Sequence, residues 1–177
     1  MKYLLPLLII LFSTVESTII FDFNKTSDTQ NWIIVDDVVM GGRSSGSFSV
    51  SPDGYGVFEG TISLKNNGGF SSVRYRSERI LTEDKTKLVV RLLGDGKEYQ
   101  LRVSANPRND LSYTAPFETS GEWQEIEIPL KDMYPVFRGR KLNRPNFDKE
   151  YFQEITFLIG NGKRETFKLL IDDIRLE

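Results

Sequence analysis

The segment 32–45 holds the densest group of residues that could do chemistry. Asp36, Asp37, Arg43 and Ser44 all fall here, next to a glycine pair that lets the backbone approach a ligand or another segment closely. These side chains could form a polar binding site at the end of the fold, since loops on a rigid scaffold often carry binding. The same residues are also compatible with an internal Asp–Arg pair that holds a tight crossover loop. Both interpretations stay open at this stage.

A second group of candidate binding residues is associated with two glycine-rich turns, at 66–69 and 94–97. Its members would offer hydrogen-bond donors and an aromatic surface to a sugar or a peptide, with Arg102 beside them. An ordinary solvated face of a β-sandwich would show similar charge spacing, so this alternative is kept. The candidates are Asn67, Ser72, Arg74, Asp95 and Tyr99.

The composition excludes most catalytic chemistry. The chain has no cysteine and no histidine, which removes thiolate metal sites, cysteine nucleophiles and the usual general base near neutral pH. A hydrolase would need two carboxyl groups about 5–9 Å apart. Asp36 and Asp37 would point to opposite faces of a strand, which disfavours them as that pair. A hydrolase that relies on carboxylates alone is kept as a third alternative, while our prediction is a chain with no catalytic residues and no cofactor.

The remaining acids do not predict a metal site. Asp22, Asp172 and Asp173 are carboxylates that could hold calcium, but no group of acids has the spacing of an EF-hand loop. The formal net charge is −2, from 23 basic and 25 acidic residues. Such a balance argues against nucleic acid as a partner.

The N-terminus has the order of a secretory signal. Lys2 precedes an apolar run from Tyr3 to Phe12, and small residues around Ser17 follow. We expect residues 1–17 to be a signal peptide and residues 18–177 to form the mature domain. The apolar run is too short to span about 30 Å of hydrocarbon, so no membrane span is expected in the mature chain. The predicted location is the periplasm, the cell envelope or the exterior.

The elements that must position these residues are strands. Short runs of alternating apolar residues recur between Gly, Asn, Asp and Pro, which is typical of an all-β, antiparallel jelly-roll β-sandwich. The segments 88–93 and 99–104 alternate in this way, and the turn at 94–97 predicts a hairpin between them. One short helix is expected at 148–153. The stretch 134–146 is expected to be rich in loops.

An ordered set of motifs resembles the complex I intermediate-associated protein 30 family over nearly all of residues 19–176. Each motif is weak alone, but the order and the spacing are specific. The main motifs are Asp36-Asp37-Val38-Val39-Met40-Gly41-Gly42-Arg43-Ser44-Ser45, Asn67-Gly68-Gly69-Phe70-Ser71-Ser72-Val73-Arg74, Gly94-Asp95-Gly96-Lys97, Gly121-Glu122-Trp123 and Phe137-Arg138-Gly139-Arg140.

The resemblance implies a galactose-binding-domain-like jelly roll with no assigned catalytic residues. It also implies kinship with a mitochondrial chaperone that assists assembly of respiratory NADH:ubiquinone oxidoreductase, complex I. The signal-like N-terminus departs from the mitochondrial members, so the assembly role does not transfer directly. We expect a non-catalytic binding module that acts on a protein partner in the cell envelope. The alternative is a carbohydrate-binding jelly-roll module.

Overall fold

The computed structural model describes residues 17–108 and 111–177. Apart from Ser17, the expected signal peptide lies outside the described residues. Within them no helix is long and apolar enough to cross a membrane. The regular elements are antiparallel strands and three short 3-10 helices, η1 (Asp37–Met40), η2 (Lys65–Asn67) and η3 (Leu130–Asp132).

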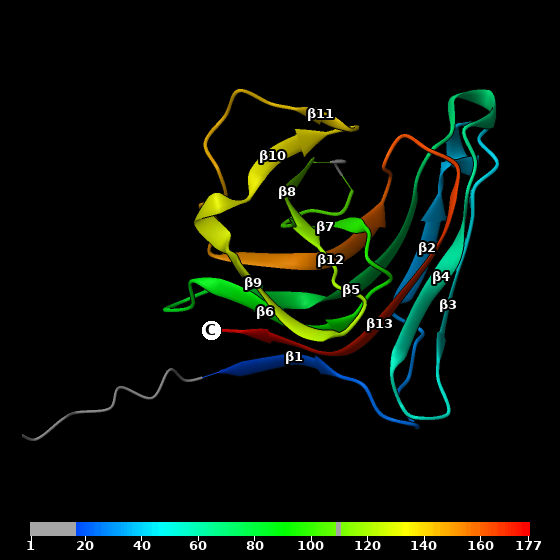
Figure 1. The fold of residues 1–177 in the computed structure, drawn as a ribbon. Coiled ribbons are helices and arrows are strands. Elements are labelled where there is room, and N and C mark those ends of the chain that lie inside the picture. Colours follow the sequence, from blue (N-terminus) through cyan, green and yellow to red (C-terminus); the bar gives the residue numbers. More distant parts are fainter. Residues whose placement is uncertain (1–16, 109–110) are drawn as a thin grey trace, which may run out of the picture.

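The strands form two sheets that pack face to face (Figure 1). The six-stranded sheet has the order β3 (Ser45–Val50), β4 (Gly56–Ile62), β13 (Glu165–Leu176), β6 (Lys87–Leu93) and β9 (Trp123–Pro129), with β1 (Thr18–Asp22) also paired to β13. The seven-stranded sheet has the order β11 (Arg140–Lys141), β10 (Tyr134–Phe137), β8 (Leu111–Glu118), β7 (Glu98–Ser104), β12 (Tyr151–Ile159), β5 (Ser71–Leu81) and β2 (Trp32–Asp36). This architecture confirms the all-β jelly-roll sandwich.

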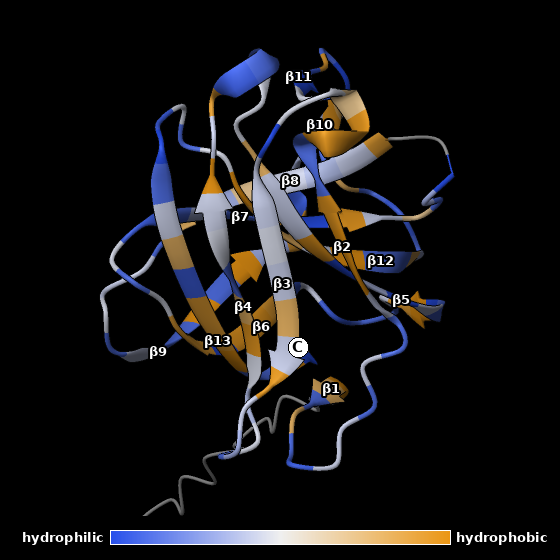
Figure 2. Cartoon of the chain, turned by 90° about the vertical axis from the view of Figure 1, so that its right-hand side faces the viewer, coloured by the Kyte–Doolittle hydropathy of each residue, from blue (hydrophilic) through white to orange (hydrophobic). Residues whose placement is uncertain are grey.

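Side-chain alternation along the strands separates a core from an outer face. On β7, Tyr99, Leu101 and Val103 are buried between the sheets, while Gln100 and Arg102 point outward. Figure 2 shows the same alternation as hydrophilic and hydrophobic bands along the strands, clearly on β13. Burial of the apolar set is what drives the two sheets together.

One end of the sandwich is closed by a cluster of aromatic rings. Trp32 of β2 stacks on Phe48 of β3, with ring centroids 4.7 Å apart. Phe21, Phe23 and Tyr75 pack against Trp32 at centroid distances of 5.0–5.3 Å. Because these rings come from both sheets, they fix how β2 and β3 approach each other.

The turn at 94–97 is not a hairpin, and this expectation was wrong. β6 lies in the six-stranded sheet between β13 and β9, whereas β7 lies in the seven-stranded sheet between β8 and β12. The turn therefore carries the chain from one sheet to the other. The same alternation and turn residues occur in a hairpin and in a connection between two sheets. Which of the two forms depends on the strands that β6 and β7 pair with.

One further expectation was wrong, and another was right only in part. The segment 148–153 forms no helix, because β12 begins at Tyr151 and Phe152 is fully buried opposite Ile80 of β5. The stretch 134–146 contains β10 and β11, which pair through Val136 and Phe137. Arg138 and Gly139 make the connecting turn with positive φ angles of 47° and 77°.

Candidate functional site

Asp37 is a buried carboxylate that joins two loops. It is fully buried at the start of η1. Its Oδ1 accepts a hydrogen bond from Ser44 N at 2.9 Å, and its Oδ2 accepts from Ser44 Oγ at 2.5 Å. Oδ2 also accepts from the backbone N–H groups of Gly69 at 2.6 Å and Phe70 at 3.3 Å. The carboxylate thus ties the loop before β3 to the loop before β5.

The pKa of Asp37 reflects this setting. Burial raises the pKa, but hydrogen bonds from the Ser44 side chain and from the backbone of Gly69, Ser44 and Phe70 outweigh it, so the pKa lies below the ordinary value. The neighbouring glycines are needed for space. A Cβ added at Gly42 would lie 2.2 Å from Asp37 Oδ1, and one added at Gly68 would lie 2.5 Å from Oδ2.

Asp36 also faces inward and links the two sheets. Its Oδ1 accepts from Ser71 Oγ of β5 at 2.6 Å, and its Oδ2 accepts from Gly46 N of β3 at 3.0 Å. The assumption that Asp36 and Asp37 point to opposite faces of a strand was wrong, because β2 ends at Asp36. Both carboxylates are instead occupied as hydrogen-bond acceptors inside the fold.

The internal Asp–Arg pair considered from the sequence does not form. Arg43 is exposed and has no ion pair within the described part of the chain. The partners of Asp37 are instead the Ser44 hydroxyl and the backbone N–H groups of Ser44, Gly69 and Phe70. Asn67 is likewise exposed, with a positive φ of 59°, while Asn66 Nδ2 donates to Gly41 O at 3.0 Å and so bridges the two loops.

The braced loop presents apolar side chains to solvent. Val38, Val39 and Met40 of η1 are 59%, 73% and 67% exposed, and Leu64 beside η2 is 46% exposed. We call Val38, Val39 and Met40 the apolar tip. The sequence motif contains these residues, but only the structure separates them from the buried Asp37 that precedes them.

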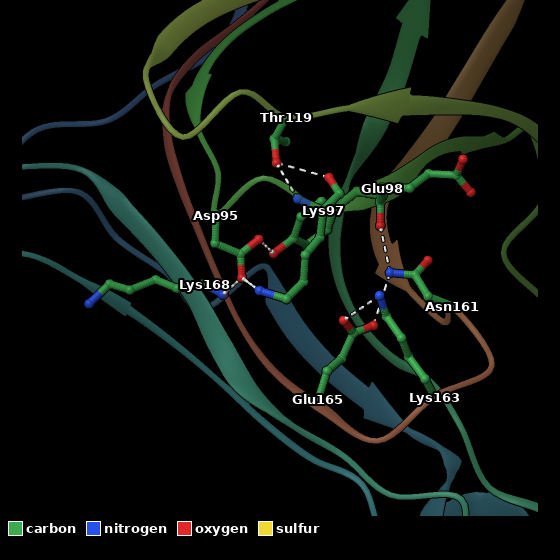
Figure 3. Close-up of polar contacts among 9 residues, drawn as sticks. Asp95, Lys97, Glu98, Thr119, Asn161, Lys163, Glu165 and Lys168 are labelled. Carbon is green, nitrogen blue, oxygen red and sulfur yellow. Dashed lines mark hydrogen bonds and ion pairs between the residues drawn. The ribbon is translucent and has the colours of Figure 1, made fainter.

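Asp95 and Tyr99 form a structural contact rather than a surface site. Tyr99 is fully buried and donates its hydroxyl to Asp95 Oδ1 at 2.9 Å. Asp95 Oδ2 accepts from Lys97 Nζ at 2.6 Å and from the backbone N–H of Lys168 at 3.0 Å (Figure 3). Burial and the nearby Asp95 charge raise the pKa of Tyr99. The expected placement of Tyr99 beside Ser72 and Arg74 was therefore wrong.

Arg74 and Arg102 lie together on the outer face of the seven-stranded sheet. Arg74 of β5 is opposite Thr156 of β12, and Thr156 is opposite Arg102 of β7. The same register continues from Arg102 to Thr114 of β8 and from there to Tyr134 of β10. We call these five residues the arginine row. Ser72, predicted for this site, is buried and donates to Val35 O at 2.8 Å, so it braces β2 instead.

Several polar atoms of the arginine row have no hydrogen-bond partner. Arg74 Nε and Thr114 Oγ1 are buried atoms that are left unpaired. Within the described residues, Arg102 donates only to Gln100 Oε1, at 2.6 and 3.2 Å. Burial and the positive charge of Arg74 lower the pKa of Arg102 to about 10. Unpaired buried polar groups cost free energy, so they point to a ligand that would complete them.

The candidate residues chosen from the sequence did not include Thr114, Tyr134 and Thr156, which belong to this surface. Alternation on their strands places each on a known face, but their strands are not neighbours along the chain. A predictor would have needed the order of the strands and their register.

Two of the three acids considered for calcium are paired with arginines. Asp172 lies 2.8 Å from Arg91 Nε, and Asp173 lies 3.1 Å from Arg175 Nη1. No group of three or more potential metal ligands of the acidic, histidine or cysteine type occurs within residues 17–108 and 111–177.

Solved structures of similar shape include several carbohydrate-binding modules. A family 11 carbohydrate-binding module from Clostridium thermocellum, in complex with a β-1,3-1,4-mixed-linked tetrasaccharide, matches with a TM-score of 0.70 at 16% identity, over 93% of this chain and 96% of that one. A family 29 carbohydrate-binding module matches with a TM-score of 0.54 at 13% identity, over 92% of each chain. An agarase matches with a TM-score of 0.61 at 12% identity, over 91% of this chain and 24% of its own. At these identities the likeness establishes the fold.

Sequence comparison gives the family. The mitochondrial complex I intermediate-associated protein 30 of Drosophila melanogaster is 24% identical over 158 residues, which cover 77% of this chain and 53% of the relative. The chain thus spans about half the length of that relative. The sequence profile described as complex I intermediate-associated protein 30 matches residues 21–171. The chain therefore belongs to the complex I intermediate-associated protein 30 family.

Proposed function

We propose that the domain is a non-catalytic binding module that holds a protein partner in the cell envelope or outside the cell. The observation that carries the proposal is the apolar tip on its braced loop. Val38, Val39 and Met40 are all more than half exposed, although Asp37 fixes their loop with four hydrogen bonds. A rigid apolar surface loses little conformational entropy on binding and gains free energy when a partner covers it.

Family membership supports a protein as the partner. The Drosophila melanogaster relative carries the name of a complex I intermediate-associated protein. The basic and apolar start of the chain favours export, which would separate this protein from a mitochondrial assembly role. We therefore propose that this chain also binds a protein, but we do not carry complex I over from the relative as its partner.

The residues available for catalysis support a binding role. The sequence has no histidine or cysteine, and both carboxylates of the Asp36-Asp37 pair are engaged in internal hydrogen bonds. An acid held below its ordinary pKa, as Asp37 is, makes a poor proton donor near neutral pH.

The test is crosslinking with mass spectrometry on tagged protein in its native cells. The variant Val39→Ser with Met40→Ser removes the apolar tip, and Leu81→Ser is the matched control because Leu81 is a 53% exposed apolar residue of β5. Wild type and the control should recover the same partner, and the tip variant should lose it. Equal recovery by all three proteins would refute the proposal.

A second candidate function is carbohydrate binding through the arginine row. It is favoured by the unpaired Arg74 Nε and Thr114 Oγ1 and by the Tyr134 ring at one end of the row. Two of the solved structures of similar shape are carbohydrate-binding modules. A glycan array read at several protein concentrations tests this candidate, and silence across a broad array would remove it.

A further inference from the structure

Near Glu154, the outer face of the seven-stranded sheet carries three arginines and one carboxylate, while the other outward acids of β7 and β8, Glu98 and Glu118, lie at the far ends of their strands. Arg74, Arg76 and Arg102 project from β5 and β7, and Glu154 of β12 is the carboxylate they share on the strand between. Glu154 is closely bound by Arg76, with Nε to Oε2 at 2.8 Å, and only loosely approached by Arg74, with Nη1 to Oε1 at 3.8 Å. One carboxylate therefore serves two arginines.

Arg102 has no carboxylate partner among the described residues. Its guanidinium donates to the neutral amide of Gln100, although its side chain is largely withdrawn from solvent. The charge of Arg74 lies close enough to disfavour the charged form of Arg102 further. Two like charges on a partly buried surface are costly unless an anion joins them. The arginine row therefore contains a positive charge that no carboxylate of the described residues balances.

The donors follow a line at right angles to the strands. The arginine row crosses β5, β12, β7, β8 and β10 in one register, a span of roughly 19 Å at the usual strand spacing. Lys141 Nζ lies 4.4 Å from the centre of the Tyr134 ring, which adds a cation at one end. To one side of the row, where β12 begins and β7 ends, a groove of about 630 Å³ is lined by Arg76, Arg79 and Arg108.

Backbone pairing decides what kind of ligand this face accepts. Each of the five strands is hydrogen-bonded to a neighbour on both sides, so no free edge is available for a peptide to add as a strand. Recognition must come from side-chain donors: guanidinium, hydroxyl and phenol groups. Such donors match a ligand rich in carboxylate and hydroxyl oxygens, with sugar rings able to lie against an aromatic ring.

We propose that the arginine row binds the carboxylate groups of an acidic oligosaccharide, one built from uronic acid units, laid across the strands of the seven-stranded sheet. This inference rests on the second candidate function and names its ligand class. Arg102 and Arg74 supply the charged donors, and Thr114 supplies a hydroxyl. Guanidinium groups suit carboxylates because two parallel N–H groups meet two oxygens.

The test is calorimetric titration of the purified protein with oligogalacturonate, and with a neutral cello-oligosaccharide of equal length. Wild type should bind the oligouronate more tightly than the neutral sugar, and the affinity should fall with added salt. Arg102→Met and Arg74→Met should each weaken binding of the oligouronate about tenfold or more. Arg102→Lys should recover part of the loss, because it restores the charge without the planar fork. The matched control Arg164→Met removes the same charge from an exposed turn residue and should change the affinity less than twofold.

The experiment distinguishes failure of the acidic ligand class from failure of carbohydrate binding itself. Equal binding of both sugars, weakened alike in the arginine variants, would overturn the acidic ligand and leave carbohydrate binding through the row standing. Equal binding that the arginine variants do not change would overturn the row as the site as well. No binding of either sugar, together with a silent array, would overturn both. A polyglutamate peptide that binds while the oligouronate does not would overturn the assignment to a glycan. Melting curves of each variant identify any that fail to fold, in which case Arg74→Lys is measured in their place.

Discussion

The stability of the domain should depend on Asp37 and not on the neighbouring Arg43. The structure gives Asp37 four donors and buries it completely, while Arg43 is exposed. Asp37→Asn keeps the volume of the side chain but removes its charge and one acceptor oxygen. Arg43→Ala removes the cation that the sequence placed beside it. The pair of variants therefore separates the two explanations of this loop.

The magnitude follows from the hydrogen bonds. In Asp37→Asn the amide oxygen is best placed at the Oδ2 position, where it can still accept from Ser44 Oγ, Gly69 and Phe70. The amide nitrogen then faces the N–H of Ser44, so two buried donor groups, that N–H and the new amide, are unpaired, and the other bonds lose their charge assistance. We expect a loss of about 2–3 kcal/mol. Asp37→Ala leaves the three backbone donors unpaired and leaves Ser44 Oγ with only its long contact to Ser63 O at 3.4 Å, and it should cost about 3–5 kcal/mol. Arg43→Ala should stay within about 0.5 kcal/mol.

The difference should also depend on pH. Because the folded pKa of Asp37 is lowered, the stabilisation from its ionised form is fully present above the ordinary value of 3.8. It declines as the pH falls from there through the folded pKa. Wild type should therefore lose stability in acid more steeply than Asp37→Asn, and the gap between them should narrow.

The assay is urea unfolding followed by tryptophan fluorescence, since Trp32 is buried in the aromatic cluster. Midpoints and slopes are compared at neutral pH and again in acid. The reasoning would be refuted if Arg43→Ala cost more than about 2 kcal/mol while Asp37→Asn cost less than about 1 kcal/mol. That result would restore the Asp–Arg pair as the element that holds the loop.

Four further variants have expected outcomes that follow from contacts in the structure. Gly42→Ala should destabilise the protein by about 2 kcal/mol or more in urea unfolding, because its Cβ would overlap Asp37 Oδ1. Gly41→Ala has open space and should cost about 1 kcal/mol, from its φ of 89° alone. Tyr99→Phe removes the hydrogen bond to Asp95 and should lower the free energy of unfolding by about 1–2 kcal/mol. The control is Tyr55→Phe, in a residue whose ring packs on Trp123, and its urea midpoint should equal that of wild type. Arg102→Met should be neutral or stabilising by about 1 kcal/mol, because it removes a charge without a counter-ion, and a clear loss of stability would mean that the row is already satisfied.

Most of the fold could be predicted because it depends on local patterns. The alternation predicted for 99–104 is found on β7, where Leu101 is in the core and Arg102 points outward. The positions of the turns were also visible in Gly and Asn residues. The helix expected at 148–153 failed because Phe152 gains more from burial opposite β5 than a short helix gains from its own hydrogen bonds.

The candidate site was predicted less well. Of the proposed residues, Asp37 and Ser44 do contact each other, but inside the fold, and Asp95 and Tyr99 do so as well. Arg74 alone of that set lies on the outer face beside other donors without partners. Residue types alone identified these positions as candidates for binding. Whether each side chain points into the fold or to solvent depends on where its strand ends, which residue types do not show.

The sequence by itself determined the all-β class and excluded catalysis that depends on histidine or cysteine, because periodicity and composition are properties of the chain alone. The tertiary structure decided which strands are neighbours. Arg74, Arg102, Thr114, Tyr134 and Thr156 are far apart along the chain, and hydrogen-bond register between five strands brings them into one line. The same packing turned Asp37 from a candidate ligand-binding group into the internal acceptor that holds the apolar tip in place. Both results follow from long-range pairing, which no local pattern specifies.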